Sequence, residues 1–347
     1  MSAKYHVALI LLVVAGATLA GFFLESYWID VAFLVMIYAG VASAWNIAGG
    51  FSGTFSFGHG LFFGIGAYTS TALFNDLGVS PWIGLILAVA GGAAAGACIA
   101  WLASRCGIGD LAFAVLTLAI AEIVYLFVDS FEPLGASRGL SIAPSMKGAL
   151  DMQFSSGGAY LAAATGFLIL CQTVAWLVYR SAMGHRFRAV RENPLAAEAM
   201  GIDPTRQRML ALGVSGALTA IGGVAYAQYL LFVNPLTFFG PAITIKVILF
   251  ALIGGMGTPW GPAIGAALFF PLGEWLRSQF GGQLPGFDTL LYGFLVIVAV
   301  LAFPRGIVGT LARRIDAAGR NTAKPSSRPV APHGIVMPAQ TNKKERT

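Results

Sequence analysis

Apolar positions in this chain are grouped into long continuous runs, separated by short polar or glycine-rich breaks. A hydrocarbon core about 30 Å thick requires roughly 20 apolar residues in a helix, so runs of this length predict membrane-spanning helices. The pattern therefore predicts an all-α polytopic membrane protein of about eight to ten transmembrane helices, some of them interrupted by glycine. The runs lie near residues 6–24, 29–48, 57–74, 82–103, 110–128, 159–179, 209–231, 243–256, 260–278 and 288–303.

The first run also has features of a secretory signal peptide, because Lys4 precedes it and it contains the small residues of "ATLAG". However, its apolar character continues through "FFL", and a second hydrophobic run begins almost at once. A signal peptide would end at a cleavage site after a shorter apolar region. We therefore expect the first run to be retained as a helix.

Basic residues are distributed unevenly between the two sides that ten crossings would create. With a cytoplasmic N-terminus, all but four of the 21 Lys and Arg residues fall on inner segments, the exceptions being Arg138, Lys147, Lys246 and Arg277. This satisfies the positive-inside rule, so both termini are expected in the cytoplasm. The net charge of +6 is thus explained by topology and does not indicate a nucleic-acid partner.

The chain is expected to form one transmembrane domain over residues 1–318. Its longest polar segments are an inner loop at 180–208 and an outer loop at 129–158, which offers a landing place for an external partner. Residues 319–347 are basic and lack an apolar period, so this tail is expected to be disordered.

Neither the cysteines nor the histidines form a recognisable chemical site. Cys98, Cys106 and Cys171 have no paired spacing, which argues against a disulfide framework and a zinc site. The four histidines are also scattered along the chain. We therefore expect no metal ion, no cofactor and no catalytic residue on this chain, which argues against an intramembrane enzyme.

Two glycine-rich segments interrupt the hydrophobic pattern: "GGFSGTFSFGHGLFFGIGAYTS" at 49–70 and "GGMGTPWGPAIGAALFFP" at 254–271. Irregular backbone at membrane depth is tolerated only where it is buried in protein or lines a wet cavity. Paired interruptions therefore point to a transport pathway, although close helix packing explains glycine equally well. The candidate pathway residues are Gly58, His59, Gly60, Glu122, Gly255, Gly257 and Thr258.

Ionisable side chains within the runs are costly unless they are paired or face water. His59 is the first choice for a pathway residue, although a hydrogen bond to a neighbouring helix explains it equally well. Glu122 could meet a substrate amine, but a structural role is favoured. Lys246 lies near the start of its run and is expected to snorkel outward.

The stretch "ENPLAAEAMGIDP" at 192–204 reads as a short capped helix within the basic inner loop. Asn193 is a favourable N-cap, Pro194 suits the first helical position, and Gly201 is placed for a left-handed C-terminal cap. A helix of about seven residues is not stable alone in water, so it must dock on a partner.

Several motifs together resemble the permease family of branched-chain amino-acid ABC transporters. They are "SFGHGLFFGIGAY", "LTLAIAEIV", "RAVRENPLAAEAMGID", "GGMGTPWGPAIGA" and "FPRGIVG", which occur in this order over about residues 56–309. The resemblance implies a multi-pass subunit in the bacterial inner membrane, surrounded by lipid. It also implies a coupling helix that docks on a cytoplasmic ATP-binding subunit, formed by Pro194, Leu195, Ala196, Ala197, Glu198, Ala199, Met200 and Gly201.

The same resemblance implies two further partners, namely a second, homologous permease subunit and a periplasmic substrate-binding protein. The chain has no G-x-x-x-x-G-K-[ST] phosphate-binding loop, so any ATPase activity resides on a partner chain. The resemblance thus describes a transport subunit rather than an enzyme.

Branched-chain amino acids are the expected substrates, but the outer loop has Arg138 where many relatives have asparagine before glycine. Urea, short amides and aromatic acids therefore stay open as alternatives. An ion-coupled secondary carrier is less favoured, since it needs membrane carboxylates and Glu122 is the one acid near mid-span.

Overall fold

Helices dominate the computed structural model, which describes residues 3–23, 25–145, 147–280, 287–303 and 306–310. These belong to a unit spanning Met1–Thr310, and the predicted disordered tail at 319–347 lies outside the described residues. The α-helices are α1 Ala3–Phe23, α2 Ser26–Asn46, α3 His59–Leu77, α4 Pro81–Arg105, α5 Asp110–Ser130, α6 Gly157–Arg180, α7 Ala182–Glu192, α8 Pro194–Ala199, α9 Pro204–Leu230, α10 Pro235–Phe239, α11 Pro241–Gly254, α12 Gly261–Phe280 and α13 Phe287–Ala302.

Short elements complete the described part of the chain. A π-helical turn, Ile47–Phe51, extends α2. The loop between α5 and α6 holds the 3₁₀ turns Glu132–Leu134, Ala136–Arg138 and Gly148–Asp151. Strand β1, Leu140–Ser141, pairs antiparallel with β2, Phe232–Val233, so that Leu140 faces Val233.

Eight helical segments among the described residues are long and apolar enough to cross a membrane. They correspond to α1, α2, α4, α5, α6, α9, the α10–α11 pair and a segment that overlaps α13. Helices α3 and α12 coincide with the two other predicted runs. The prediction of a polytopic all-α membrane protein with about eight to ten helices is thus confirmed.

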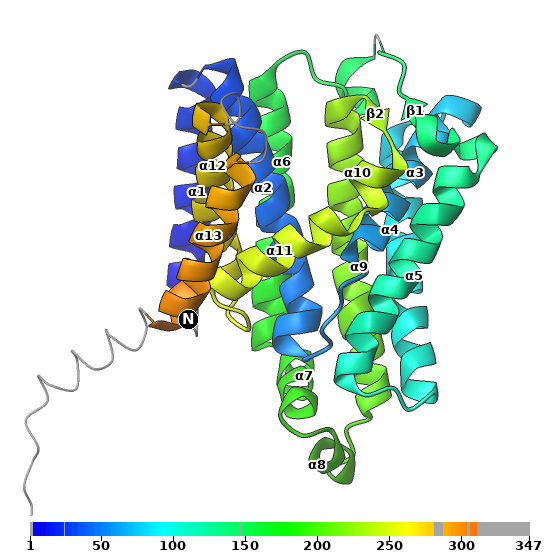
Figure 1. Cartoon of the computed structure of the whole chain (residues 1–347), viewed down its shortest axis with the longest axis vertical. Helices are drawn as coiled ribbons and strands as arrows, with labels where there is room; N and C mark the ends of the chain where they lie inside the picture. The colour runs from blue at the N-terminus through cyan, green and yellow to red at the C-terminus, as the bar shows by residue number, and fades with distance from the viewer. Residues whose placement is uncertain (1–2, 24, 146, 281–286, 304–305, 311–347) are drawn as a thin grey trace, which may run out of the picture. The chain divides into compact units, whose positions relative to one another are not determined.

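Close packing of α4 on α9 depends on glycine. A Cβ atom on Gly92 would lie 2.6 Å from the Gly216 carbonyl oxygen, and one on Gly96 would lie 2.5 Å from that of Leu212. Without side chains at these positions, the two helix backbones can approach closely, as small residues allow in membrane proteins. Helix α9 also contacts α2, α3 and α6 and so lies in the middle of the helices (Figure 1).

The two ends of the helical unit differ in structure. Figure 1 shows α7 and α8 at one end, and β1 and β2 at the other. The predicted outer loop, 129–158, is folded at the strand end, where Trp82 Nε1 donates to the Ala149 carbonyl at 3.0 Å. Ser80 Oγ donates to the Leu150 carbonyl at 2.6 Å. The loop is therefore held by hydrogen bonds at this end.

Candidate functional site

Both glycine-rich segments break helices, as their sequences predict. Between the π-helical turn and α3, residues 52–58 are not helical, and a turn at 255–260 separates α11 from α12. Gly53, Gly255 and Gly257 have φ values of +73°, +126° and +82°. L-residues with a side chain rarely adopt such values, so glycine is required by the backbone here.

Asn46 joins the two breaks, although they are far apart in the sequence. Its Nδ2 donates to the Thr258 carbonyl at 2.9 Å, and its Oδ1 accepts from the Gly257 amide at 2.8 Å. The Asn46 side chain is fully buried, so these bonds are shielded from water. A Cβ atom on Gly50 would overlap both Asn46 Oδ1 and the Gly257 amide. We call Asn46, Gly50, Gly257 and Thr258 the glycine node.

Thr258 connects the node to the start of α12. Its hydroxyl donates to the Gly255 carbonyl at 2.8 Å and accepts from the Gly261 amide at 3.1 Å. The first of these bonds closes the turn, and the second satisfies an amide at the helix start that has no partner within the helix. A displacement of the node would therefore move the first turn of α12.

Arg191 links the inner loop to the glycine node. It lies in the last turn of α7, and its Nη1 donates to the Gly50 carbonyl. A Cβ atom on Gly53 would lie 2.8 Å from Arg191 Cγ, and one on Gly257 would lie 2.9 Å from Nη1. The arginine thus fits against backbone from both breaks, and the missing side chains make room for it.

Helix α7 is held firmly enough to position Arg191. Ser181 caps its start by accepting from the Gly184 amide at 3.3 Å. Phe187 and Val190 are buried, while Arg188 Nη1 donates to the Tyr179 carbonyl at the end of α6 at 3.0 Å. The helix therefore packs one apolar face on the membrane helices and keeps its other face polar.

Helix α8 has the ends that its sequence predicts. Asn193 Oδ1 accepts from the Ala196 amide at 3.1 Å, and Gly201 adopts a left-handed φ of +79°. Asp203 Oδ1 accepts from the Thr205 amide at 2.9 Å, which starts α9. These caps determine where the short helix begins and where the chain turns back to the membrane.

The two faces of α8 differ sharply in exposure. Leu195 is 77% exposed and Met200 is 82% exposed, whereas Ala197 is only 4% exposed. Ala196, Glu198, Ala199 and Gly201 are also exposed, and Pro194 is half-buried. The surface available to a partner is therefore an apolar tip around Leu195 and Met200, and Ala197 belongs to the inward face.

His59 is buried at the start of α3 and joins three helices. Its Nε2 lies 2.7 Å from Ser215 Oγ on α9, and that hydroxyl donates to the Ala44 carbonyl on α2 at 2.7 Å. Because the single hydroxyl proton of Ser215 is used on Ala44, His59 Nε2 must be the donor.

The glycines on either side of His59 are closely packed as well. A Cβ atom on Gly58 would lie 2.5 Å from the Thr117 carbonyl oxygen, and one on Gly60 would lie 2.7 Å from that of Phe239.

Replacing His59 with alanine is expected to destabilise the folded chain. The change removes a buried hydrogen bond and leaves space in a closed region, at a cost of about 1–3 kcal/mol. The thermal midpoint of the purified protein in detergent should fall by several degrees, and it should stay the same for His185→Ala, which changes an exposed histidine. An unchanged midpoint for His59→Ala would contradict the structural role.

The predicted pathway residues do not form one cluster. Gly255, Gly257 and Thr258 lie at the turn between α11 and α12, while Gly58, His59 and Gly60 lie at the start of α3. Glu122 is half-buried on α5, and among the described residues no ion pair or side-chain hydrogen bond joins it to either group.

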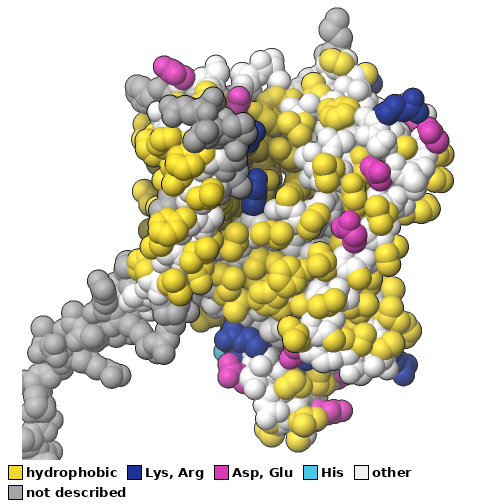
Figure 2. Space-filling view, viewed as in Figure 1, with side chains coloured by type: hydrophobic (Ala, Val, Ile, Leu, Met, Phe, Trp, Pro, Cys, Tyr) yellow, Lys and Arg dark blue, Asp and Glu magenta, His cyan; other side chains and the backbone are white. Residues whose placement is uncertain are grey.

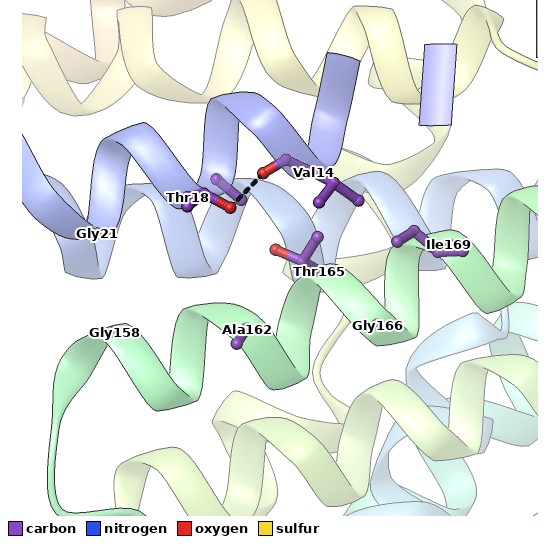
Figure 3. A pocket seen from close by; sticks show the side chains of 9 residues that line it. Val14, Thr18, Gly21, Gly158, Ala162, Thr165, Gly166 and Ile169 are labelled. Carbon is purple, nitrogen blue, oxygen red and sulfur yellow. Dashed lines mark hydrogen bonds between the residues drawn. The ribbon is translucent and has the colours of Figure 1, made fainter. Parts of the chain in front are cut away.

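A groove between α1 and α6 is mostly apolar (Figure 3). It has a volume of about 480 Å³, and its two hydroxyl groups already bond within their own helices. Thr18 Oγ1 donates to the Val14 carbonyl at 2.8 Å, and Thr165 Oγ1 donates to the Leu161 carbonyl at 2.7 Å. The groove therefore offers little to a charged or strongly polar ligand.

A second cavity, between α11, α12 and α13, contains charged side chains. Figure 2 shows a hollow above α11 in which basic side chains are visible. The cavity has a volume of about 380 Å³ and is lined by Lys246, Phe250, Phe270, Gly273, Glu274, Arg277 and Tyr292. Glu274, which lies within the run at 260–278, was not among the candidate residues, and Lys246 was expected to snorkel outward. In the structure, Lys246 is exposed and also lines this cavity, with its Nζ 5.6 Å from the centre of the Tyr38 ring.

Comparisons with known proteins identify related transport permeases. The family model described as the permease component of branched-chain amino acid transport systems matches residues 27–300. The high-affinity branched-chain amino acid transport system permease protein LivM of Escherichia coli is 28% identical over 331 residues, which cover 88% of this chain and 74% of LivM.

Other relatives are named for different substrates. The guanosine ABC transporter permease protein NupQ of Bacillus subtilis is 31% identical over 274 residues, covering 72% of this chain and 81% of NupQ. The autoinducer 2 import system permease protein LsrC of Escherichia coli is 26% identical over 182 residues, covering 51% of this chain and 50% of LsrC. No solved structure matches the chain.

Proposed function

Since this chain belongs to the permease-component family of branched-chain amino acid transport systems, we propose that it carries branched-chain amino acids across the bacterial inner membrane as one subunit of an ABC importer. The relatives are transport subunits, and this chain is a multi-pass membrane protein. ATP hydrolysis on separate subunits would drive the movement. The observation that carries the proposal is α8, a capped helix with an exposed apolar tip beyond the end of the membrane helices.

We call the path by which motion of the ATP-binding subunit reaches the membrane helices the coupling route. It starts at this tip. In the proposal, Leu195 and Met200 enter a groove of the cytoplasmic ATP-binding subunit, whose closure on ATP moves α8 and α7 together. Arg191 then transmits this motion to the glycine node through its bond to the Gly50 carbonyl. Because the node joins the end of α2 to the turn between α11 and α12, motion there would reorient membrane helices.

The remaining partners follow from the same assembly. A second, homologous permease subunit would complete the membrane part, and a periplasmic substrate-binding protein would deliver the amino acid. The folded loop at 129–158 is the proposed landing surface for that protein, since it lies at the end opposite α8. In the proposal, α8 and both termini lie in the cytoplasm, as the distribution of basic residues predicts.

Substrate identity is best tested by reconstitution with the partner subunits. The complex in proteoliposomes should take up labelled leucine, isoleucine or valine only when ATP and the binding protein are supplied. Guanosine, urea and an aromatic acid serve as competing substrates. Preferential uptake of one of these would overturn the amino-acid proposal. Uptake by this chain alone, driven by an ion gradient, would instead establish a secondary carrier.

A further inference from the structure

The cavity between α11, α12 and α13 has an arrangement of charges that neither the fold nor the coupling route requires. Lys246 lies on α11, whereas Glu274 and Arg277 lie one turn apart on α12. Among the described ion pairs, none joins the Glu274 carboxylate to either cation within 4 Å. The three groups therefore line one space without neutralising one another by direct contact.

Charged side chains within membrane helices are costly, and they usually mark a substrate or ion pathway. A cavity with cations from two helices and one carboxylate can satisfy both ends of a zwitterion. A ligand carboxylate would bind Lys246 and Arg277, and a ligand ammonium group would bind Glu274. Charge-assisted hydrogen bonds of this kind are roughly twice as strong as those between neutral groups.

The apolar part of the cavity suits the rest of such a ligand. Phe250, Phe270 and Tyr292 line it together with the charged groups. Phe270 is stacked on Tyr38, with ring centroids 4.9 Å apart, and Phe250 meets the Phe270 ring edge-on at 6.3 Å. An aliphatic side chain can pack on these aromatic faces and be removed from water.

We propose that this cavity binds the α-carboxylate and α-ammonium groups of a free amino acid during its passage, an inference that rests on the proposed importer function. Its volume of about 380 Å³ falls in the range of small-molecule sites. Lys246, Glu274 and Arg277 are then substrate-binding residues of the membrane subunit. The charged residues recognise the α-carboxylate and α-ammonium groups, which all amino acids share. The aromatic residues that line the cavity accept an apolar side chain.

The position of the cavity connects it to the glycine node. Lys246 lies on α11 before the Gly255–Thr258 turn, and Glu274 lies on α12 after it. A change in the angle between the two helices at this turn therefore alters the distance between Lys246 and Glu274. Motion passed from Arg191 to the node would consequently change the affinity of the cavity for a zwitterion.

The test uses the reconstituted complex with saturating binding protein and labelled leucine. Glu274→Gln and Lys246→Met should each lower the rate of ATP-dependent uptake by about tenfold, the size expected for losing one charged hydrogen-bond partner. Glu274→Asp keeps the charge and should restore part of the rate. Glu25→Gln and Lys4→Met make the same chemical changes at exposed positions and should have no effect.

A binding measurement separates this inference from the importer function. Saturation-transfer NMR on the purified complex without binding protein should show contact with leucine, and weaker contact with 4-methylpentanoate and 3-methylbutylamine, which each lack one charged group. Loss of the leucine signal in Glu274→Gln, with the protein still monodisperse in detergent, supports the site. Full-rate leucine uptake by both variants would overturn it and leave the importer function intact. Failure of the unaltered complex to transport or bind any amino acid would overturn both.

Discussion

Arg191→Ala is expected to separate ATP hydrolysis from transport. The substitution removes the bond to the Gly50 carbonyl and the packing of the arginine stem against Gly53, so α7 and α8 lose their direct link to the glycine node. A hydrogen bond from a charged group contributes about 1.5–3 kcal/mol, which corresponds to roughly a 10- to 100-fold loss in coupling. Uptake by the reconstituted complex should fall by this factor while its ATPase rate persists.

Two further variants test whether the loss of uptake depends on the bond between Arg191 and the glycine node. Arg186→Ala removes another exposed α7 arginine, which makes no described bond to the glycine node, and should leave uptake unchanged. Arg191→Lys keeps the positive charge on a shorter donor and should give an intermediate rate. Equal loss of uptake and ATPase activity in Arg191→Ala would contradict the coupling route, because it would indicate failed assembly instead.

A double substitution at the tip of α8, Leu195→Asp with Met200→Asp, is expected to abolish association with the ATP-binding subunit. Both side chains are more than three-quarters exposed in this chain and would be buried on docking. Burial of each such side chain contributes about 1.5–3 kcal/mol, so their combined loss should weaken binding more than hundredfold. Co-purification of the tagged chain with its ATP-binding partner measures this directly.

The matched control for this variant is Leu77→Asp. Leu77 is 69% exposed at the end of α3 and lies away from α8, so association with the ATP-binding subunit should persist. Ala197→Asp would be a poor test, since Ala197 is buried and a carboxylate there would disturb α8 itself. Normal co-purification of the Leu195/Met200 variant would show that α8 is not the docking element.

Local signals in the sequence predicted most of the fold. Apolar runs identified the membrane helices because their length must match the bilayer. Asn193 and Gly201 located the two ends of α8, because capping depends on neighbouring residues alone. The two glycine-rich breaks were also predicted, since glycine is needed where the backbone takes positive φ values.

Residue roles within the site were less predictable. His59 was weighed as a pathway residue and as a packing residue, and its contact with Ser215 on α9 was not visible in its neighbours along the chain. Glu274 was overlooked because a charge near the end of an apolar run resembles an ordinary interfacial residue. Glu274 and Lys246 line the same cavity because α11 and α12 lie side by side in the fold, which the sequence does not display.

The sequence by itself determined that this chain is a polytopic helical membrane protein with a capped inner-loop helix and two glycine-rich breaks. Apolar length, capping and glycine conformation are local properties, so the sequence displays them directly. Only the tertiary structure decided that Asn46 joins the breaks, that Arg191 reaches them, and that Lys246 and Glu274 share a cavity. These contacts join residues far apart in the chain, and they form because helix packing brings otherwise unrelated backbone and charged groups together.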